Sequence, residues 1–426
     1  MKTEDLYILF KRCSCVITDS RKIVKDCLFI ALKGDNFNGN LFAKEALQKG
    51  AAYALIDETQ YQNSDRIILV KDTLTALQKL ASYHRKKLNT PIISLTGSNG
   101  KTTTKELINA VLSKKYQTIA TIGNLNNHIG VPLSLLRLTE DTEIGIIEMG
   151  ANHQKEIAFL CNIANPDYGL ITNFGKAHLE GFGGVEGVIK GKSEMYDYLT
   201  KENKYIFYNE DDPLQLKKLK TYAYKEGFGA SNSSSFQVSL QENNNHFLKL
   251  KADGSVINTQ LTGTYNLTNV AYAILIGNYF KVSKTDIKDA IENYVPENNR
   301  SQILEINNNR IILDAYNANP SSMKAALDNL EAIKGVAKMA ILGDMFELGD
   351  EAAAEHQSIA EMAVSLTNTT VLLVGENFYK TNTSLSKFKT FEEAQEHLSD
   401  NLPQQKTILI KGSRGMALER LLITLK

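Results

Sequence analysis

One stretch of the sequence reads Ile92-Ile93-Ser94-Leu95-Thr96-Gly97-Ser98-Asn99-Gly100-Lys101-Thr102-Thr103. Its first residues predict a buried strand, and the residues from Lys101 to about Leu112 predict a helix. Glycines between the two let backbone N–H groups turn toward an anion, and the helix N-terminus adds its dipole. Lys101 can reach the β- and γ-phosphates, and Thr102 can ligate Mg²⁺. We therefore expect ATP to contact Gly97, Ser98, Asn99, Gly100, Lys101, Thr102 and Thr103.

This loop is a variant of the common phosphate-loop pattern, because Leu95 stands where a glycine is usual, five residues before Gly100. Glycine-rich turns also join strands to helices without binding anything. The Gly-Lys-Thr order between a strand and a helix favours nucleotide binding over that alternative. The loop predicts an ATPase domain, but it does not identify the group that is phosphorylated.

Strands and helices alternate on both sides of the loop. The apolar runs 144–147 and 168–171 are too short for helices, and a helical pattern follows each. This order is typical of a parallel sheet with helices on both faces. Residues 236–240 and 247–251 alternate apolar and polar around an Asn-rich turn, which predicts an inserted antiparallel hairpin.

The length of 426 residues exceeds what one hydrophobic core normally serves, so several domains are expected. Residues 1–86 contain three short apolar runs and predict a small α/β domain. Residues 87–298 hold the phosphate loop, and residues 299–426 predict a second open α/β sheet. We expect an α/β protein of three domains, with further strands at 27–32, 52–56, 66–70, 311–313, 339–342, 371–374 and 408–410.

Charge and composition exclude several classes of partner. The chain has 48 basic and 48 acidic residues, so nothing global attracts nucleic acid or an anionic membrane. No run approaches the roughly 18 apolar residues of a membrane span, and the first residues lack the order of a signal peptide. We expect a cytoplasmic protein without membrane insertion. Its four cysteines are sparse and predict free thiols.

Later in the chain, three side chains are of types that can bind a metal ion or a phosphate: Glu148, His178 and Lys192. Glu148 follows the run 144–147 at the edge where open α/β sheets place ligands, and it can hold Mg²⁺; a helix N-cap acid is the alternative. His178 lies in a glycine-rich turn after the run 168–171, although a lone histidine is more often structural. Lys192 follows on the next helix, as a phosphate partner or as a solvated surface charge.

These motifs resemble the Mur ligase family over nearly the whole chain. The loop 96–103, the strand end 148–151 and the histidine turn 177–181 are similar to the family's counterparts. In that family the lysine that matches Lys192 is carbamylated by CO₂, which makes it anionic. The resemblance implies two Mg²⁺ ions, the first held by Thr102 and Glu148 and the second by His178 and carbamylated Lys192.

The resemblance also implies the reaction. ATP phosphorylates a substrate carboxylate, an amine attacks the acyl phosphate, and an amide forms as phosphate leaves. Mg²⁺ and Lys101 can neutralise the transferring phosphoryl group while the protein positions the reactants. The expected catalytic residues are Lys101, His178 and Lys192.

Other segments resemble the family's substrate-binding parts. Residues 19–21 and 28–34 are similar to a UDP-binding N-terminal domain, with Ser20 and Arg21 as nucleotide contacts. An Asp-Gly-His-like turn usually follows there, whereas residues 35–40 read Asp-Asn-Phe-Asn-Gly-Asn. The loop 123–132, which alone would be read as a turn, resembles the part that holds a UDP-MurNAc-peptide. The implied contacts are Asn124, Asn126 and Asn127.

Two segments near the third domain's strands, 313–323 and 343–349, closely resemble family members that add D-alanyl-D-alanine to UDP-MurNAc-tripeptide. These two molecules are the implied substrates, and a monomer is expected. A motif of members that add meso-diaminopimelate is absent, because residues 317–320 read Asn-Ala-Asn-Pro. Asn269 would face adenine, unless it only starts a helix. The implied ATP contacts are Asn269, Arg300 and Asp314, and the implied dipeptide contacts are Tyr316, Asn317 and Asn319.

Alternative functions remain open. A folylpolyglutamate synthetase-type ligase shares the loop and the metal lysine but generally lacks the UDP-binding domain. A P-loop kinase would give a stable phosphorylated product without an amine. A silent UDP-sugar-binding protein would not turn over ATP, which intact Thr102, Glu148, His178 and Lys192 argue against.

Overall fold

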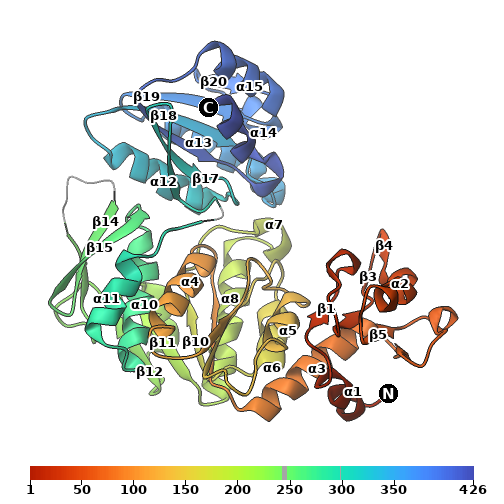
Figure 1. Ribbon diagram of the computed structural model, residues 1–426. Coiled ribbons are helices and arrows are strands. Elements are labelled where there is room, and N and C mark those ends of the chain that lie inside the picture. The colour runs from red at the N-terminus through yellow and green to blue at the C-terminus, as the bar shows by residue number, and fades with distance from the viewer. Residues whose placement is uncertain (242–246, 298) are drawn as a thin grey trace.

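The computed structural model describes residues 1–241, 247–297 and 299–426. Three α/β units follow one another along the chain, coloured red to orange, orange to green, and blue (Figure 1). The expected fold class, an α/β protein with mostly parallel sheets, is confirmed. Among the described residues no helix combines the length and the apolar character needed to cross a membrane.

The N-terminal unit is built on a four-stranded parallel sheet in the order β1-β2-β5-β6. The turn that departs from the family pattern lies around β3 and β4, and the buried Asn40 anchors it by two hydrogen bonds with Asp57. Helix α3 ends at Leu88, two residues beyond the proposed domain boundary. The elements are α1 (Thr3–Phe10), β1 (Val16–Ile17), η1 (Ser20–Lys22), β2 (Leu28–Ile30), β3 (Lys33–Gly34), β4 (Phe37–Asn38), η2 (Gly39–Phe42), α2 (Ala43–Gln48), β5 (Tyr53–Ile56), η3 (Thr59–Tyr61), β6 (Ile67–Leu69) and α3 (Thr73–Leu88).

The central unit has a six-stranded parallel sheet in the order β12-β11-β10-β7-β9-β8. The register pairs Leu95 of β7 with Glu148 of β9, so the phosphate loop and the acid share one sheet edge. The elements are β7 (Ile92–Thr96), α4 (Lys101–Leu112), β8 (Thr118–Ala120), α5 (Gly130–Leu135), β9 (Ile144–Glu148), α6 (Glu156–Ala164), β10 (Tyr168–Ile171), α7 (Leu179–Phe182), α8 (Val185–Lys201), β11 (Tyr205–Asn209), α9 (Pro213–Leu219), β12 (Lys225–Phe228), α10 (Asn266–Tyr279) and α11 (Lys284–Glu292).

The predicted hairpin is confirmed, and a third antiparallel strand joins it. The order is β13-β14-β15, with β13 (Val238–Leu240), β14 (Phe247–Ala252) and β15 (Ser255–Thr262). The expected Asn-rich turn falls largely on 242–246, outside the described residues.

The C-terminal unit has a sheet in the order β16-β17-β21-β18-β19-β20. All pairs are parallel except β16 with β17, which are antiparallel. The predicted strands are present, and the edge strands β16 and β20 were not predicted. The elements are β16 (Gln302–Ile306), β17 (Asn309–Asp314), α12 (Pro320–Ala332), β18 (Ala337–Gly343), η4 (Gly349–Glu351), α13 (Ala352–Val364), β19 (Thr369–Val374), α14 (Glu376–Tyr379), β20 (Ser386–Phe388), α15 (Phe391–Asp400), β21 (Lys406–Lys411), η5 (Arg414–Met416), η6 (Leu418–Arg420) and α16 (Leu421–Thr424).

Candidate active site

The phosphate loop depends on two glycines. Gly97 and Gly100 have φ angles of 147° and 79°, which are rare for residues with a side chain. A Cβ atom would lie 2.0 Å from Thr172 Oγ1 at Gly97, and 2.4 Å from Asn269 Oδ1 at Gly100. Glycine is therefore required at both positions, both for the backbone angle and for space.

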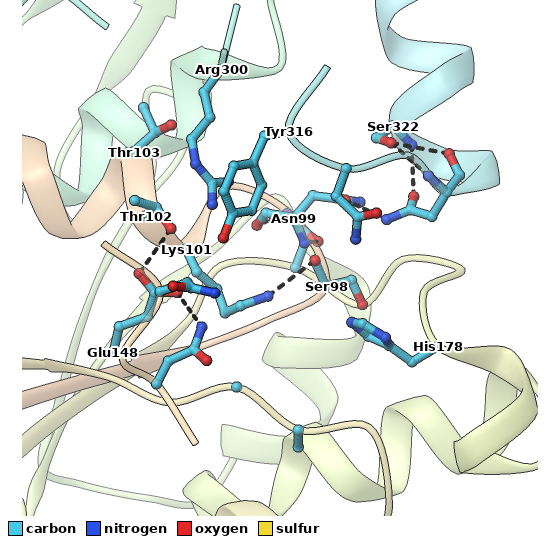
Figure 2. Close-up of a pocket in the computed structure, with 18 of the residues that line it drawn as sticks. Ser98, Asn99, Lys101, Thr102, Thr103, Glu148, His178, Arg300, Tyr316 and Ser322 are labelled. Carbon is cyan, nitrogen blue, oxygen red and sulfur yellow. Dashed lines mark hydrogen bonds between the residues drawn. The ribbon is translucent and has the colours of Figure 1, made fainter. Parts of the chain in front are cut away.

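Lys101 is the first residue of α4, and its side chain bends back toward the preceding phosphate loop. Its Nζ atom donates hydrogen bonds to the carbonyl oxygens of Gly97 (2.8 Å) and Ser98 (3.2 Å), as Figure 2 shows for Ser98. Burial lowers the pKa of Lys101, while Glu148 opposes this shift. A bound phosphate would give the ammonium group a stronger partner than these carbonyls.

Two residues that directly follow β10, the strand beside β7, hold the loop. Asn173 accepts a hydrogen bond from the Asn99 backbone N–H (3.0 Å), and Thr172 donates one to the Asn99 carbonyl (2.6 Å). On its other side, Asn99 Oδ1 accepts a hydrogen bond from Asn319 (2.8 Å), which belongs to the C-terminal unit. Sequence reasoning did not identify Thr172 or Asn173, although polar residues at the end of a buried strand were a signal.

Glu148 connects the loop to the Asn-rich segment. Its carboxylate accepts hydrogen bonds from the Thr102 hydroxyl (2.9 Å) and from Asn126 (2.7 Å), and its side chain is buried (Figure 2). The N-cap alternative is wrong, because the next helix, α6, begins at Glu156. Hard oxygen donors in this arrangement fit Mg²⁺.

Lys192 is fully buried, so the alternative of a solvated surface charge is wrong. Its Nζ atom donates to the Ala151 carbonyl (3.0 Å) and lies 4.9 Å from the centroid of the Phe182 ring. None of the described carboxylates forms an ion pair with it. Burial lowers its pKa well below the usual value for lysine, which favours the neutral amine that can react with CO₂. The residue therefore fits carbamylation.

His178 lies at the boundary between the central and C-terminal units. It precedes α7 with a left-handed φ of 53°, and its Nδ1 atom is 2.5 Å from Glu347 Oε2. This contact lowers the pKa of Glu347. The other ring nitrogen remains available for a metal ion.

The C-terminal unit contributes an ion pair between a buried lysine and a partly exposed aspartate. Lys411 Nζ lies 2.6 Å from Asp314 Oδ2 and donates to the Asn317 carbonyl (3.3 Å). Sequence reasoning missed Lys411, although a lysine that directly follows the apolar run 408–410 was a signal. Beside it, the Arg300 guanidinium stacks 3.5 Å from the centroid of the Tyr316 ring (Figure 2).

One cavity of about 560 Å³ brings most of the predicted residues together, between the central and C-terminal units. Two predicted residues belong to the same site without lining the cavity: Gly97 supports the loop, and Lys192 lies beneath Ala151. The predicted residues that line it are Ser98, Asn99, Gly100, Lys101, Thr102, Thr103, Asn124, Asn126, Asn127, Glu148, His178, Asn269, Arg300, Asp314, Tyr316, Asn317 and Asn319.

Ser20 and Arg21 are not among the residues that line this cavity. Arg21 is exposed and binds Asp19 through two hydrogen bonds of 2.9 Å, which lowers the pKa of Asp19 to about 2. The two residues thus remain a separate candidate site in the N-terminal unit.

A phosphate loop facing a second α/β unit across a shared cavity defines a nucleotide-dependent enzyme that works between its domains. Three family models match in order: the Mur ligase family catalytic domain (residues 12–85), the Mur ligase middle domain (95–277), and the Mur ligase glutamate ligase domain (299–414). The chain belongs to the Mur ligase family.

Relatives match over nearly their full length. The chain is 36% identical to the UDP-N-acetylmuramoyl-tripeptide–D-alanyl-D-alanine ligase of Bacillus subtilis, covering 95% of this chain and 92% of the relative. Its identity to the Escherichia coli ligase of the same name is 34%, covering 96% and 93%.

Solved structures agree with these relatives. MurF from Acinetobacter baumannii is 28% identical, with a TM-score of 0.87, covering 100% of this chain and 98% of that one. The MurF ligase of Thermotoga maritima in complex with ADP is also 28% identical, with a TM-score of 0.84, covering 98% and 97%.

Proposed function

We propose that this protein joins D-alanyl-D-alanine to UDP-MurNAc-tripeptide in an ATP-dependent reaction that passes through an acyl phosphate. The observation that carries the proposal is the shared cavity, in which the phosphate loop faces Tyr316, Asn317 and Asn319. The names of relatives that match over more than nine-tenths of their length supply the substrates. The N-terminal unit would bind the UDP part, the central unit ATP, and the C-terminal unit the dipeptide.

The residues of the cavity suit the two chemical steps. The loop 97–103 binds the phosphates of ATP, and Lys101 turns from its own loop carbonyls toward the transferred phosphoryl group. Arg300, stacked on Tyr316, places a second cation beside the nucleotide. The amine of the dipeptide then approaches from the C-terminal unit, so the cavity mainly holds the two reactants together.

Two Mg²⁺ ions complete the proposed site. Thr102 and Glu148 would hold one, and His178 with carbamylated Lys192 would hold the other. Such ions neutralise charge on phosphate oxygens when they are bound. The chain's own contribution is the pair of oxygen donors on Thr102 and Glu148 and the complete burial of Lys192.

The test is a coupled assay of phosphate release by the purified protein. We expect release from ATP only when both UDP-MurNAc-tripeptide and D-alanyl-D-alanine are present. A kinase would release no phosphate but would give a stable phosphorylated product without the dipeptide. Equal turnover with single D-alanine would contradict the substrate assignment. A cytoplasmic location and a monomeric state remain predictions.

A further inference from the structure

Arg414 is a cation near the cavity that forms no ion pair with any of the described acidic residues. It follows β21 in the turn Gly412-Ser413-Arg414, where the Ser413 hydroxyl accepts a hydrogen bond from the backbone N–H of Phe346 (2.9 Å). The adjacent Gly415 packs against the same phenylalanine, whose Cε2 atom would lie 2.9 Å from a Cβ atom. The backbone that carries Arg414 is therefore held in place, while its side chain is exposed.

The side chain of Arg414 approaches a wall of the cavity. Its guanidinium carbon lies 5.6 Å from the centroid of the Tyr316 ring, and Arg300 lies 3.5 Å from the same centroid. Lys411, three residues earlier, is neutralised by Asp314 at 2.6 Å. Two arginines that share one ring repel each other unless anions lie nearby. If Arg300 serves the nucleotide, Arg414 is left for a second anion.

The incoming dipeptide supplies such an anion. Its amine must reach the acyl phosphate at the phosphate loop, and its carboxylate is at the opposite end. Two extended residues span at most about 7 Å, so the carboxylate reaches toward the C-terminal unit. A guanidinium group matches a carboxylate through two parallel hydrogen bonds. We propose that Arg414 binds the C-terminal carboxylate of the incoming dipeptide; this inference rests on the proposed function.

The experiment compares D-alanyl-D-alanine with its C-terminal amide, which keeps the amine and lacks the charge. For the wild-type enzyme we expect kcat/KM to favour the carboxylate roughly tenfold to a hundredfold, the range given by charge-assisted hydrogen bonds. Arg414→Met should bring this ratio close to one, mainly by raising KM for the carboxylate form. Arg414→Lys should keep part of the preference for the carboxylate form, because lysine retains the positive charge but cannot form the two parallel hydrogen bonds of a guanidinium group.

Arg420→Met is the matched control, because Arg420 is also an exposed arginine of this segment, stacked instead on Phe391 at 3.8 Å. It should retain the wild-type ratio. An unchanged ratio in Arg414→Met, or a wild-type enzyme that uses both compounds equally, would overturn the inference while leaving the proposed function intact. A wild-type enzyme that ligates neither compound would overturn the proposed function, and the inference with it.

Discussion

His178 of the central unit and Glu347 of the C-terminal unit lie 2.5 Å apart, from Nδ1 to Oε2. The backbone N–H of Glu180 also donates to the Glu347 carbonyl (3.3 Å). A carboxylate on one ring nitrogen fixes the orientation of the imidazole and leaves the other nitrogen for a metal ion. Glu347 of the C-terminal unit thereby orients His178, a residue of the proposed metal site.

Glu347→Gln should weaken the response to Mg²⁺. Loss of such a carboxylate partner typically costs about 10- to 100-fold in metal affinity or activity. A Mg²⁺ titration of phosphate release measures the effect. Glu355→Gln is the control, because it breaks a second ion pair between the central and C-terminal units, Lys176 to Glu355 at 2.5 Å, without touching His178. Equal shifts in both variants would assign the effect to domain contact instead.

Lys192→Ala should abolish ligation, whereas Lys192→Glu should retain a fraction of it. Only the glutamate can replace the negative charge of a carbamate. The activities of the two variants are compared by measuring product formation with both substrates. Circular dichroism checks that each variant folds. Full activity in the alanine variant would exclude the carbamate.

Lys411→Met should destabilise the C-terminal unit by about 2 kcal/mol, because the partly exposed Asp314 carboxylate loses its cation and is left with the hydrogen bond from the Ser301 backbone N–H. Lys324→Met removes an ion pair of the same length, 2.6 Å to Asp328, that is largely exposed. Such a pair contributes about 0.5 kcal/mol or less. Urea unfolding of both variants measures the loss in the free energy of unfolding. Equal losses would contradict a larger contribution from the buried Lys411 than from the exposed Lys324.

Stability should fall as the pH drops below 6.5, in part through His84. Its ring is buried between the Leu138 carbonyl (2.9 Å) and the Tyr7 hydroxyl (3.3 Å), and burial lowers its pKa from 6.5. The unfolded chain therefore takes up a proton near pH 6.5, whereas the folded chain does so only at lower pH. His84→Gln should flatten the decrease of the unfolding temperature between pH 7.5 and 5.5. An identical decrease in both proteins would contradict this origin.

Gly100→Ala should impair nucleotide binding more than it impairs folding. Alanine would have to adopt a φ angle near 79°, which is rare for a residue with a side chain. Its Cβ atom would lie 2.4 Å from Asn269 Oδ1, so the Asn269 side chain would have to move. Calorimetric titration with ADP, next to thermal unfolding of the same variant, separates the two effects. Unchanged ADP affinity would remove Gly100 from the phosphate site.

Much of the fold could be predicted because strands and helices follow from local periodicity. The helix after the phosphate loop begins at Lys101 and ends at Leu112, as predicted, and the polar ends of β7 and β9 meet at one edge because parallel strands align there. The strands β16 and β20 were missed, since at a sheet edge they carry less continuous apolar patterns.

The sequence by itself determined the phosphate loop, the three α/β units and, through resemblance, the candidate ATP-, metal- and substrate-binding residues. Only the tertiary structure decided that Lys192 is buried beneath Ala151, that Glu347 reaches His178, and that Lys411 neutralises Asp314. Each of these relationships joins residues about 40 to 170 positions apart. Periodicity reports which face of an element is buried, but not which distant charge lies against it, because that depends on how sheets and domains pack.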